Sequence, residues 1–277
     1  MSPLEVVIVI ASVASLFAWV ASLVSGDTSW VDRMWSIVPV VYVWVFAGYA
    51  HLNDTRLNVM AVLVTLWGVR LTFNFARKGG YTGVEDYRWP VLRAGMTAWQ
   101  FQLFNLFFIV IYQMFLLVLI TMPALTAYDN QGTSFGAVGI TLTVLFVLLL
   151  AGETVADQQQ WNFHKTKHAD IAARRTPDPQ FLQTGLFKFS RHPNYFFEIS
   201  QWWVVYLFGA AAAASLFQWT IAGAVLLTLL FVGSTRFTEK ITLSKYPEYA
   251  DYQRRTSPVI PWIPRRPKTV TAEVSQS

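Results

Sequence analysis

The sequence predicts an all-helical integral membrane protein with about seven transmembrane helices. Hydrophobic residues make up 54% of the 277 residues and charged residues only 13%, against roughly 25% charged residues in soluble domains. Several uncharged apolar runs approach the ~20 residues that a helix needs to cross a bilayer. Because lipid offers no hydrogen-bond partner to the backbone, such runs are expected to form helices.

Seven segments have the composition of a membrane span. They are Pro3–Val24, Trp35–Ala50, Leu57–Ala76, Phe101–Met122, Phe135–Gly152, Tyr195–Ala214 and Trp219–Thr235. The first lacks a preceding basic segment and is longer than the apolar core of a signal peptide, so we interpret it as a span. Without an internal repeat or a low-complexity segment, we expect a single domain over residues 1–277, with a disordered tail at 263–277.

Lys and Arg residues cluster after the third, fifth and seventh predicted spans, whereas the loops at 123–134 and 215–218 contain none. The positive-inside rule then places the N-terminus outside and the C-terminus in the cytoplasm. We expect the protein in a membrane such as the bacterial inner membrane. The net charge of +5 follows from these loops and does not indicate nucleic-acid binding. The absence of cysteine excludes disulfides and a thiol nucleophile, and we expect no metal site because the four histidines are scattered.

Polar residues mark the start of the sixth span. Asn194, Glu198 and Gln201 recur at i, i+4 and i+7 and share one helix face. Such groups at the end of a membrane helix require polar partners. Arg191 and His192 precede the helix N-terminus, where free N–H groups favour an anion. This arrangement indicates a binding site for a phosphate-bearing cofactor with a carboxamide group.

The fifth span ends in a similar row with Glu153 and Asp157 on one face, and a basic loop follows. Acidic groups near a helix C-terminus oppose the dipole and suggest cationic or N–H partners, although a solvated helix end is the alternative. The loop carries Lys165, Lys167, Arg174 and Arg175. These residues either hold a phosphate or diphosphate, or provide ordinary positive charge facing anionic lipid.

The segment after the seventh span runs from Arg236 through Glu239 to a row of tyrosines, Tyr246, Tyr249 and Tyr252. Tyrosines three residues apart form a stripe on one helix face. Such a stripe either anchors the helix in the headgroup layer or covers an adenine or ribose. For Tyr246 the anchor is favoured, and for Tyr252 both interpretations stay open.

On the N-terminal side, Arg70 lies inside the third span, where a charge is a candidate functional group with a carboxylate as its expected partner. Asp32, near the second span, is the expected carboxylate, and a structural ion pair is the alternative. The next cytoplasmic loop holds Glu85, Asp86 and Tyr87, which either belong to a site or form loop salt bridges.

Together these motifs resemble the DUF1295 branch of the steroid 5-alpha-reductase-like membrane enzymes. The resemblance rests on Ser190-Arg-His-Pro-Asn-Tyr195 with Glu198, on Glu153 with Ala156-Asp157-Gln158, on Leu66-Trp-Gly-Val-Arg-Leu71 with Glu85-Asp86-Tyr87-Arg88, and on Glu239 with Tyr249, Tyr252 and Ile260-Pro261. It implies a seven-span fold and NADPH bound from the cytoplasm by residues 135–262. Residues 1–100 would line the substrate side.

Reduction of a carbon–carbon double bond conjugated to a carbonyl is the reaction that the resemblance implies. Asp157, Asn194 and Glu198 match positions that hold the cofactor, the last two near the nicotinamide amide. Asp32 falls where steroid reductases carry the glutamate that orients the substrate carbonyl. Trp67 occupies the position of their proton-donating tyrosine, and its N–H cannot protonate an enolate. Tyr87, Tyr81 or a water held by Asp32 are alternative donors.

We therefore expect an NADPH-dependent reductase of an apolar lipid enone, such as a 3-oxo-Δ4-steroid, that enters from the bilayer. The expected catalytic residues are Asp32, Trp67, Arg70 and Tyr87. The expected cofactor-binding residues are Glu153, Asp157, Lys165, Arg174, Arg191, His192, Asn194, Tyr195, Glu198, Arg236, Glu239, Tyr249 and Tyr252. The C-terminal signature also resembles isoprenylcysteine carboxyl methyltransferases, which bind S-adenosylmethionine, and a non-catalytic lipid-binding protein is a third possibility.

Overall fold

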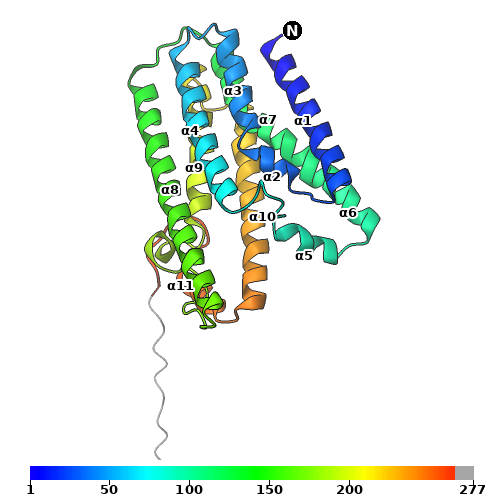
Figure 1. Cartoon of the computed structure of the whole chain (residues 1–277). Coiled ribbons are helices and arrows are strands. Elements are labelled where there is room, and N and C mark those ends of the chain that lie inside the picture. Colours follow the sequence, from blue (N-terminus) through cyan, green and yellow to red (C-terminus); the bar gives the residue numbers. More distant parts are fainter. Residues whose placement is uncertain (266–277) are drawn as a thin grey trace, which may run out of the picture. The chain divides into compact units, whose positions relative to one another are not determined.

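The computed structural model describes residues 1–265, and this part of the chain folds into helices without a β-strand (Figure 1). The helices are α1 (Pro3–Ser25), α2 (Trp30–Trp35), α3 (Val38–Tyr49), α4 (Thr55–Arg77), α5 (Arg88–Ala94), α6 (Ala98–Phe104), the π-helix η1 (Asn105–Tyr112), α7 (Gln113–Asp129), α8 (Gly136–Ala172), the 3₁₀-helix η2 (Gly185–Lys188), α9 (Pro193–Ala212), α10 (Ile221–Lys245) and α11 (Tyr249–Arg255). The predicted all-helical class is confirmed. The part of the predicted tail at 266–277 lies outside the described residues.

Six segments of the described chain are long and apolar enough to cross a membrane: Pro3–Ser25, Trp30–Tyr49, Thr55–Arg77, Ala98–Asp129, Gly136–Ala172 and Ile221–Lys245. Helix α9 has 20 residues but is not among them, because its polar row and its tryptophans lower its hydropathy. The sixth predicted span thus stays a prediction. The fifth was drawn too short, since α8 continues past Gly152 to Ala172 through residues that include neither proline nor glycine.

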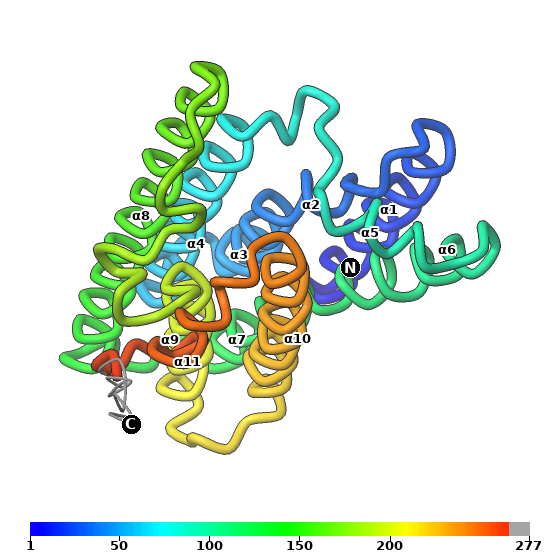
Figure 2. The backbone as a smooth tube through the Cα atoms, turned by 90° about the horizontal axis from the view of Figure 1, so that it is seen from below, coloured from blue at the N-terminus to red at the C-terminus, as the bar shows by residue number. Residues whose placement is uncertain are grey.

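The chain divides into two compact units that alternate along the sequence. The first unit comprises Met1–Gly152 and Phe197–Val232, and the second comprises Glu153–Phe196 and Gly233–Ser277. Helices α8, α9 and α10 each contribute one end to each unit, as can be followed along the tube in Figure 2. The predicted single domain is not tested by this division and stays a prediction.

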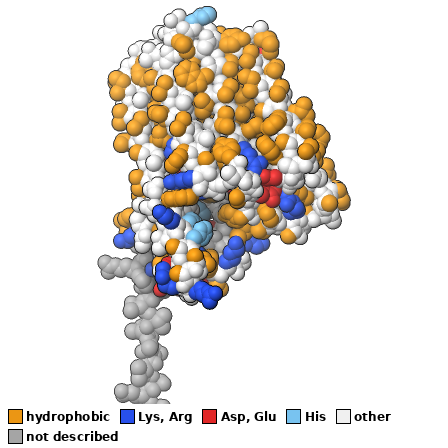
Figure 3. Space-filling view, viewed as in Figure 1, with side chains coloured by type: hydrophobic (Ala, Val, Ile, Leu, Met, Phe, Trp, Pro, Cys, Tyr) orange, Lys and Arg blue, Asp and Glu red, His pale blue; other side chains and the backbone are white. Residues whose placement is uncertain are grey.

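In the first unit, α3 packs against α4, α7 and α1. The core between these helices is made of fully buried large side chains, among them Tyr42, Phe46, Met60, Trp67 and Leu117. The outward faces are apolar too: α1 alone exposes Ile8, Val13, Leu16, Phe17 and Val24. Hydrophobic side chains cover much of the surface of the long helices (Figure 3). An apolar exterior over an apolar core is what lipid surroundings require.

Two glycines let α9 and α10 approach the backbone of α7 closely. A Cβ built on Gly223 would lie 2.4 Å from the carbonyl oxygen of Leu119, and one on Gly209 would lie 2.7 Å from that of Pro123. Contacts this short cannot be relieved by a side-chain rotation because the opposing atoms belong to the backbone.

We expect the Gly223→Ala variant to lose about 1–3 kcal/mol of stability through overpacking. The thermal unfolding midpoint in detergent measures this loss. Gly233→Ala is the matched control in the same helix, because a Cβ there would meet nothing within 4 Å. Alanine should be neutral or mildly stabilising at that position. Equal midpoints for the two variants would contradict the packing argument.

Candidate functional site

In the first unit, the carboxylate of Glu198 lies buried among two indoles and a guanidinium. Its Oε2 accepts a hydrogen bond of 2.8 Å from Trp67 Nε1 and lies 3.3 Å from Arg70 Nη2, while its Oε1 accepts one of 3.3 Å from Trp202 Nε1. The side chain of Glu198 is only 6% exposed. We call these four residues the Glu198 cluster. A carboxylate so deeply buried is compatible with an apolar helix bundle only because donors surround it.

The sequence spacing of the cluster explains its geometry. Trp67 and Arg70 are three residues apart and project from one face of α4, and Trp202 follows Glu198 by one turn of α9. Gly68 sets how close α4 lies to the start of α3, since a Cβ there would lie 2.6 Å from the Ser36 carbonyl oxygen, just before α3, and 2.6 Å from Val40 Cγ2. The indoles of Trp67 and Trp202 also pack edge to face, with ring centroids 4.9 Å apart. Packing and hydrogen bonding therefore orient the same two side chains.

The predicted partnership between Arg70 and Asp32 is wrong. Arg70 lies against Glu198, whereas Asp32 on α2 accepts a hydrogen bond of 2.9 Å from Trp89 Nε1 and lies 3.9 Å from Arg88. The expectation that the ends of two helices lie level does not show which carboxylate a guanidinium contacts. Trp67, which the sequence suggested as a group polarising a substrate carbonyl, uses its single N–H on Glu198 instead.

In much of the acidic segment before α5, the structure shows the loop salt bridges that the sequence analysis named as one of two alternatives. Glu85 accepts hydrogen bonds from Arg93 Nη2 at 2.6 Å and from the backbone N–H and hydroxyl of Thr28. The Asp86 carboxylate accepts from Arg88 Nε at 2.8 Å, and the Asp86 backbone N–H donates to the Ser29 hydroxyl at 2.9 Å. These contacts attach the 85–93 segment to the 27–33 segment. The predicted catalytic Tyr87 lies exposed at the start of α5.

Asp27 belongs to the same set of contacts and supports a prediction about pH. Burial by itself would raise the pKa of Asp27, but hydrogen bonds from Ser29 and Arg33 together with the Arg33 charge outweigh it and lower the pKa below the usual 3.8. A depressed carboxyl pKa contributes stability above the unfolded-state value, and that contribution is lost as the pH falls through the folded-state value.

We therefore expect the free energy of unfolding of the parent chain to decrease as the pH falls below about 4. The Asp27→Asn variant should lose less stability over the same pH range. Thermal midpoints at pH 5 and pH 3 measure the difference. Asp129→Asn is the control, because it removes the same charge at an exposed helix end. If the thermal midpoints of Asp27→Asn and Asp129→Asn change with pH as the midpoint of the parent chain does, Asp27 does not contribute to the pH dependence of stability.

In the second unit, Glu239 on α10 gathers four donors. It forms a bidentate pair with Arg191, with distances of 2.6 Å to Nε and 2.9 Å to Nη2, and accepts from His192 Nε2 at 3.1 Å. Gln253 Nε2 at 2.9 Å and the Tyr249 hydroxyl at 3.4 Å complete the set. We call these five residues the Glu239 cluster.

The Glu239 cluster changes the interpretation of the Arg-His pair before α9. Arg191 also donates to the backbone oxygens of Gln253 and Thr256, and its side chain is only 8% exposed. Its donors thus join α9, α10 and α11 rather than face a cavity. The backbone supports the same connection, because the N–H groups of Arg191 and His192 bind Ser257 and Pro258. The sequence suggested a phosphate contact here, and the structure shows an internal ion pair.

Two of the three tyrosines of the stripe, Tyr249 and Tyr252, are buried as well, and Tyr246 is half-buried. The Tyr252 hydroxyl donates to the Phe187 carbonyl at 2.5 Å, and the rings of Tyr249 and Tyr252 both pack against Phe181, at 5.0 and 5.6 Å between centroids. Burial raises the pKa of both hydroxyls. Neither side chain has the exposed ring that the membrane-anchor and adenine-cover interpretations each require. The stripe is part of the core of the second unit.

The other predicted cofactor residues of the second unit lie in three different settings. Glu153 and Asp157 are buried on α8. Asn194 is half-buried on the first turn of α9, and its side chain makes no hydrogen bond to another residue in the described part of the chain, while Tyr195 stacks on His192. Three are exposed: Lys165, Arg174 and Arg236.

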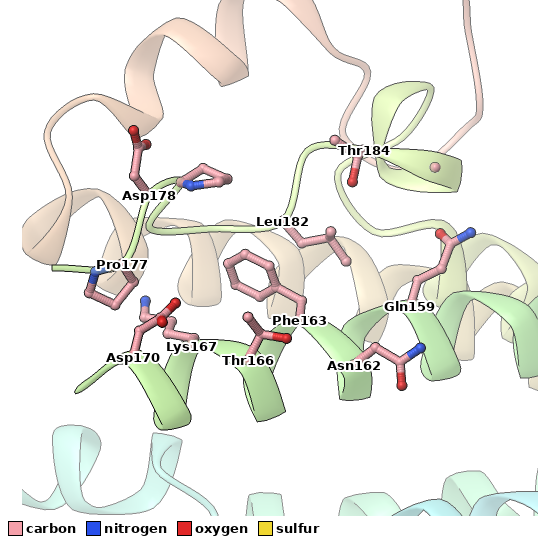
Figure 4. A pocket seen from close by; sticks show the side chains of 12 residues that line it. Gln159, Asn162, Phe163, Thr166, Lys167, Asp170, Pro177, Asp178, Leu182 and Thr184 are labelled. Atoms are coloured by element: carbon pink, nitrogen blue, oxygen red, sulfur yellow. The ribbon is translucent and has the colours of Figure 1, made fainter. Parts of the chain in front are cut away.

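A cavity of about 420 Å³ lies between α8 and the loop that follows it, within the second unit. Its lining residues are Gln159, Asn162, Phe163, Thr166, Lys167, Asp170, Pro177, Asp178, Pro179, Leu182, Thr184 and Gly185. Figure 4 shows that Phe163 and Leu182 point into the space between helix and loop and that Gln159 points toward the Thr184 end. We call it the first cavity. It combines flat apolar walls with amides, hydroxyls and carboxylates.

Local contacts hold the loop over α8. Gln159 accepts a hydrogen bond of 2.9 Å from the Leu186 N–H. Gly185 has a φ of +62°, in the left-handed region that favours glycine, and a Cβ there would lie 2.6 Å from the Gln159 side chain, which would have to shift. Lys167 donates to the Gln180 carbonyl at 2.5 Å and to the Tyr246 hydroxyl at 2.9 Å. Tyr246 therefore has a polar partner in this unit.

Sequence reasoning missed most of the first cavity. The α8 residues that line it recur at i, i+3, i+4, i+7, i+8 and i+11 from Gln159 to Asp170, which is the pattern of one helix face. That pattern was a usable signal, but the sequence analysis treated the segment that carries Lys165 and Lys167 as a loop, whereas α8 continues to Ala172. Trp202 was missed because a tryptophan in an apolar span is most often a packing residue.

Comparisons with known proteins identify the family. The family described as "Protein of unknown function (DUF1295)" matches residues 18–256. The chain is 37% identical over 276 residues to the uncharacterized protein C594.04c of Schizosaccharomyces pombe, a match that covers 94% of this chain and 80% of the relative. No solved structure matches. With a family match over most of its length and a relative this similar, the chain belongs to the DUF1295 family.

Proposed function

We propose that this protein is an NADPH-dependent membrane reductase that reduces the carbon–carbon double bond of an apolar conjugated enone, such as a 3-oxo-Δ4-steroid. The observation that carries the proposal is the first cavity of the second unit. Its volume of about 420 Å³ lies within the range of small-molecule sites, which is about 300–1,000 Å³. Such a cavity with mixed apolar and polar walls suits one end of a nucleotide.

The lining of the first cavity matches the parts of a nucleoside. Phe163 and the two prolines offer flat apolar surfaces for a planar base, and the amides of Gln159 and Asn162 offer donors and acceptors for its edge. Carboxylates accept hydrogen bonds from the hydroxyls of a ribose in many dinucleotide sites. Asp170 and Asp178 supply carboxylates at one end of the cavity. These residues take the place of the Arg191 and tyrosine contacts that the sequence suggested.

In the first unit, the Glu198 carboxylate has an acceptor position that suits a carboxamide. A carboxylate has about four lone-pair positions, and the described residues use three of them, from Trp67, Arg70 and Trp202. One acceptor position is left for an amide N–H of a carboxamide group. Asn194, four residues earlier in α9, has a side-chain amide without a partner in the described chain. Each of the two groups, taken by itself within its own unit, is complementary to part of a carboxamide.

The bound cofactor would supply a hydride to the β-carbon of the enone. The resemblance assigns the substrate carbonyl to Asp32, which the Trp89 indole holds in place. The proton for the neighbouring carbon has to come from a group more acidic than an indole, so Trp67 is not the donor. Tyr87 and Tyr81 are the side-chain candidates. The apolar exterior of the first unit is compatible with a lipid substrate that arrives from the bilayer.

The test is calorimetry with NADPH and with S-adenosylmethionine on the purified protein in neutral-lipid nanodiscs. Turnover of a 3-oxo-Δ4-steroid is followed by the absorbance of NADPH. We expect NADPH to bind and Asn194→Ala and Glu198→Gln to weaken it. The control is Glu248→Gln, an exposed carboxylate of the second unit.

The outcomes separate the candidate functions. Binding of S-adenosylmethionine without NADPH would make the protein a methyltransferase. If neither ligand binds while the lipid does, the protein is a non-catalytic lipid-binding protein. NADPH binding without steroid turnover would retain the cofactor and reject the substrate class.

A further inference from the structure

The connection between α9 and α10 exposes large apolar side chains. It covers residues 213–220 of the first unit, and we call it the α9–α10 turn. Phe217 is 94% exposed, Leu216 66% and Trp219 60%. Exposed apolar side chains that lie this close together mark a surface that contacts either lipid or another protein. The composition, length and hydrogen bonding of the surrounding hairpin distinguish between these two partners.

The sequence around the α9–α10 turn contains no charged residue. From Ile199 to Thr235 there is no Asp, Glu, Lys or Arg. The other two turns of the first unit that join long helices differ in this respect, because Asp54 lies between α3 and α4 and Asp129 ends α7. Charged side chains are usual where a turn emerges into water and costly where it stays in lipid. The composition therefore favours lipid around the α9–α10 turn.

The charge-free part of α10 is too short to carry the turn through the bilayer. Arg236 is exposed and follows Ile221, the first residue of α10, by 15 residues (236 − 221 = 15), a rise of about 22 Å. The hydrocarbon core is about 30 Å thick, and an exposed arginine is costly inside it. With Arg236 at one boundary of the core, α10 begins about 8 Å short of the other boundary. In Figure 1 the yellow α9–α10 turn also lies lower than the blue turn between α3 and α4 of the same unit.

The backbone of the turn finds its hydrogen-bond partners within the hairpin, as lipid surroundings require. Of the six N–H groups at positions 213–218, five bind acceptors that belong to residues 206–215. The hydroxyl of Tyr206, a buried residue of α9, accepts from the Gln218 N–H at 3.5 Å and donates to the Leu216 carbonyl. A buried phenol thus replaces water as the partner of two backbone groups of the turn.

We propose that the α9–α10 turn stays inside the bilayer, in the leaflet opposite the Arg236 end of α10, and that its partner is the lipid acyl chains. Phe217 and Leu216 contact the acyl chains, and Trp219 lies toward the headgroup layer, where tryptophan is favoured. Helices α9 and α10 then form a hairpin closed within the membrane rather than two complete crossings joined by a loop in water. This inference goes beyond the proposed function and does not depend on it.

The experiment uses single cysteines, which the cysteine-free chain accepts without background. Phe217→Cys and Leu216→Cys are placed one copy per nanodisc and treated with a membrane-impermeant maleimide. Both side chains are exposed, so neither substitution disturbs the core. Gln131→Cys, at an exposed position of the turn between α7 and α8, is the matched reference in water. Because the thiolate reacts and apolar surroundings suppress it, we expect both cysteines of the α9–α10 turn to react at least about 10-fold more slowly than the reference.

A second measurement identifies what surrounds the turn. A bimane fluorophore attached to Phe217→Cys in detergent, before reconstitution, should be quenched more strongly by lipids brominated on their acyl chains than by iodide in the water. The opposite order is expected for Gln131→Cys. Maleimide labelling of the α9–α10 turn as fast as that of the reference would place the turn in water and overturn the proposal. Slow labelling without quenching by brominated lipid would show that protein covers the turn, and it would overturn the proposal as well.

Discussion

Replacing Glu239 by alanine is expected to destabilise the second unit by about 3–5 kcal/mol, the cost of removing one partner of a buried ion pair. Four residues would lose their common acceptor: Arg191, His192, Tyr249 and Gln253. The guanidinium of Arg191 would keep only backbone carbonyls. Limited proteolysis of the segments after α8 and α10, together with the thermal midpoint in detergent, measures the loss.

Two further variants make this prediction specific. Glu248→Ala removes an exposed carboxylate near the start of α11. It should change the free energy of unfolding by less than about 0.5 kcal/mol. The double variant Glu239→Leu/Arg191→Met should recover part of the lost stability, because it leaves no buried charge without its partner. If the double variant is as unstable as Glu239→Ala, stability depends on packing around Glu239 and not on the ion pair.

The second large effect is expected in the first unit, where Glu198→Gln keeps the side-chain shape and removes the charge. The amide can accept from only one oxygen, and its NH₂ would face an indole N–H, so at least one of the three donors loses its acceptor. Arg70 also loses the carboxylate that compensates it. We expect a loss of about 2–5 kcal/mol, measured by thermal unfolding with tryptophan fluorescence as the signal.

Phenylalanine substitutions rank the contacts within the Glu198 cluster. Trp67→Phe removes a hydrogen bond of 2.8 Å and Trp202→Phe one of 3.3 Å, while both keep an aromatic ring at the site. We expect Glu198→Gln to be the most destabilising, Trp67→Phe next at about 1–3 kcal/mol, and Trp202→Phe the least. Asp129→Asn serves as the charge control. An inverted order of Trp67 and Trp202 would show that ring packing outweighs the hydrogen bonds.

Part of the candidate site was accessible from the sequence, because helical spacing determines which residues share a face. The row of Asn194, Glu198 and Gln201 and the row of Glu153 and Asp157 were predicted in this way, and the structure buries Glu153, Asp157, Glu198 and Gln201. The spacing could not show which residue of a distant helix each group contacts. Arg70 was assigned to Asp32 and is found with Glu198, since the rotation of a helix about its axis is fixed by packing, here through Gly68.

The sequence by itself determined the class of this protein, an all-helical membrane protein, because a 20-residue apolar run has only one stable way to satisfy its backbone in lipid. It also determined which polar residues are too costly to bury alone. Only the tertiary structure decided how those residues are satisfied: Arg191 and Glu239 satisfy each other, and Trp67 and Trp202 satisfy Glu198. Partners of a buried charge come from segments far apart in the chain, and hydrogen bonds depend on ångström-scale distances that only the packed helices set.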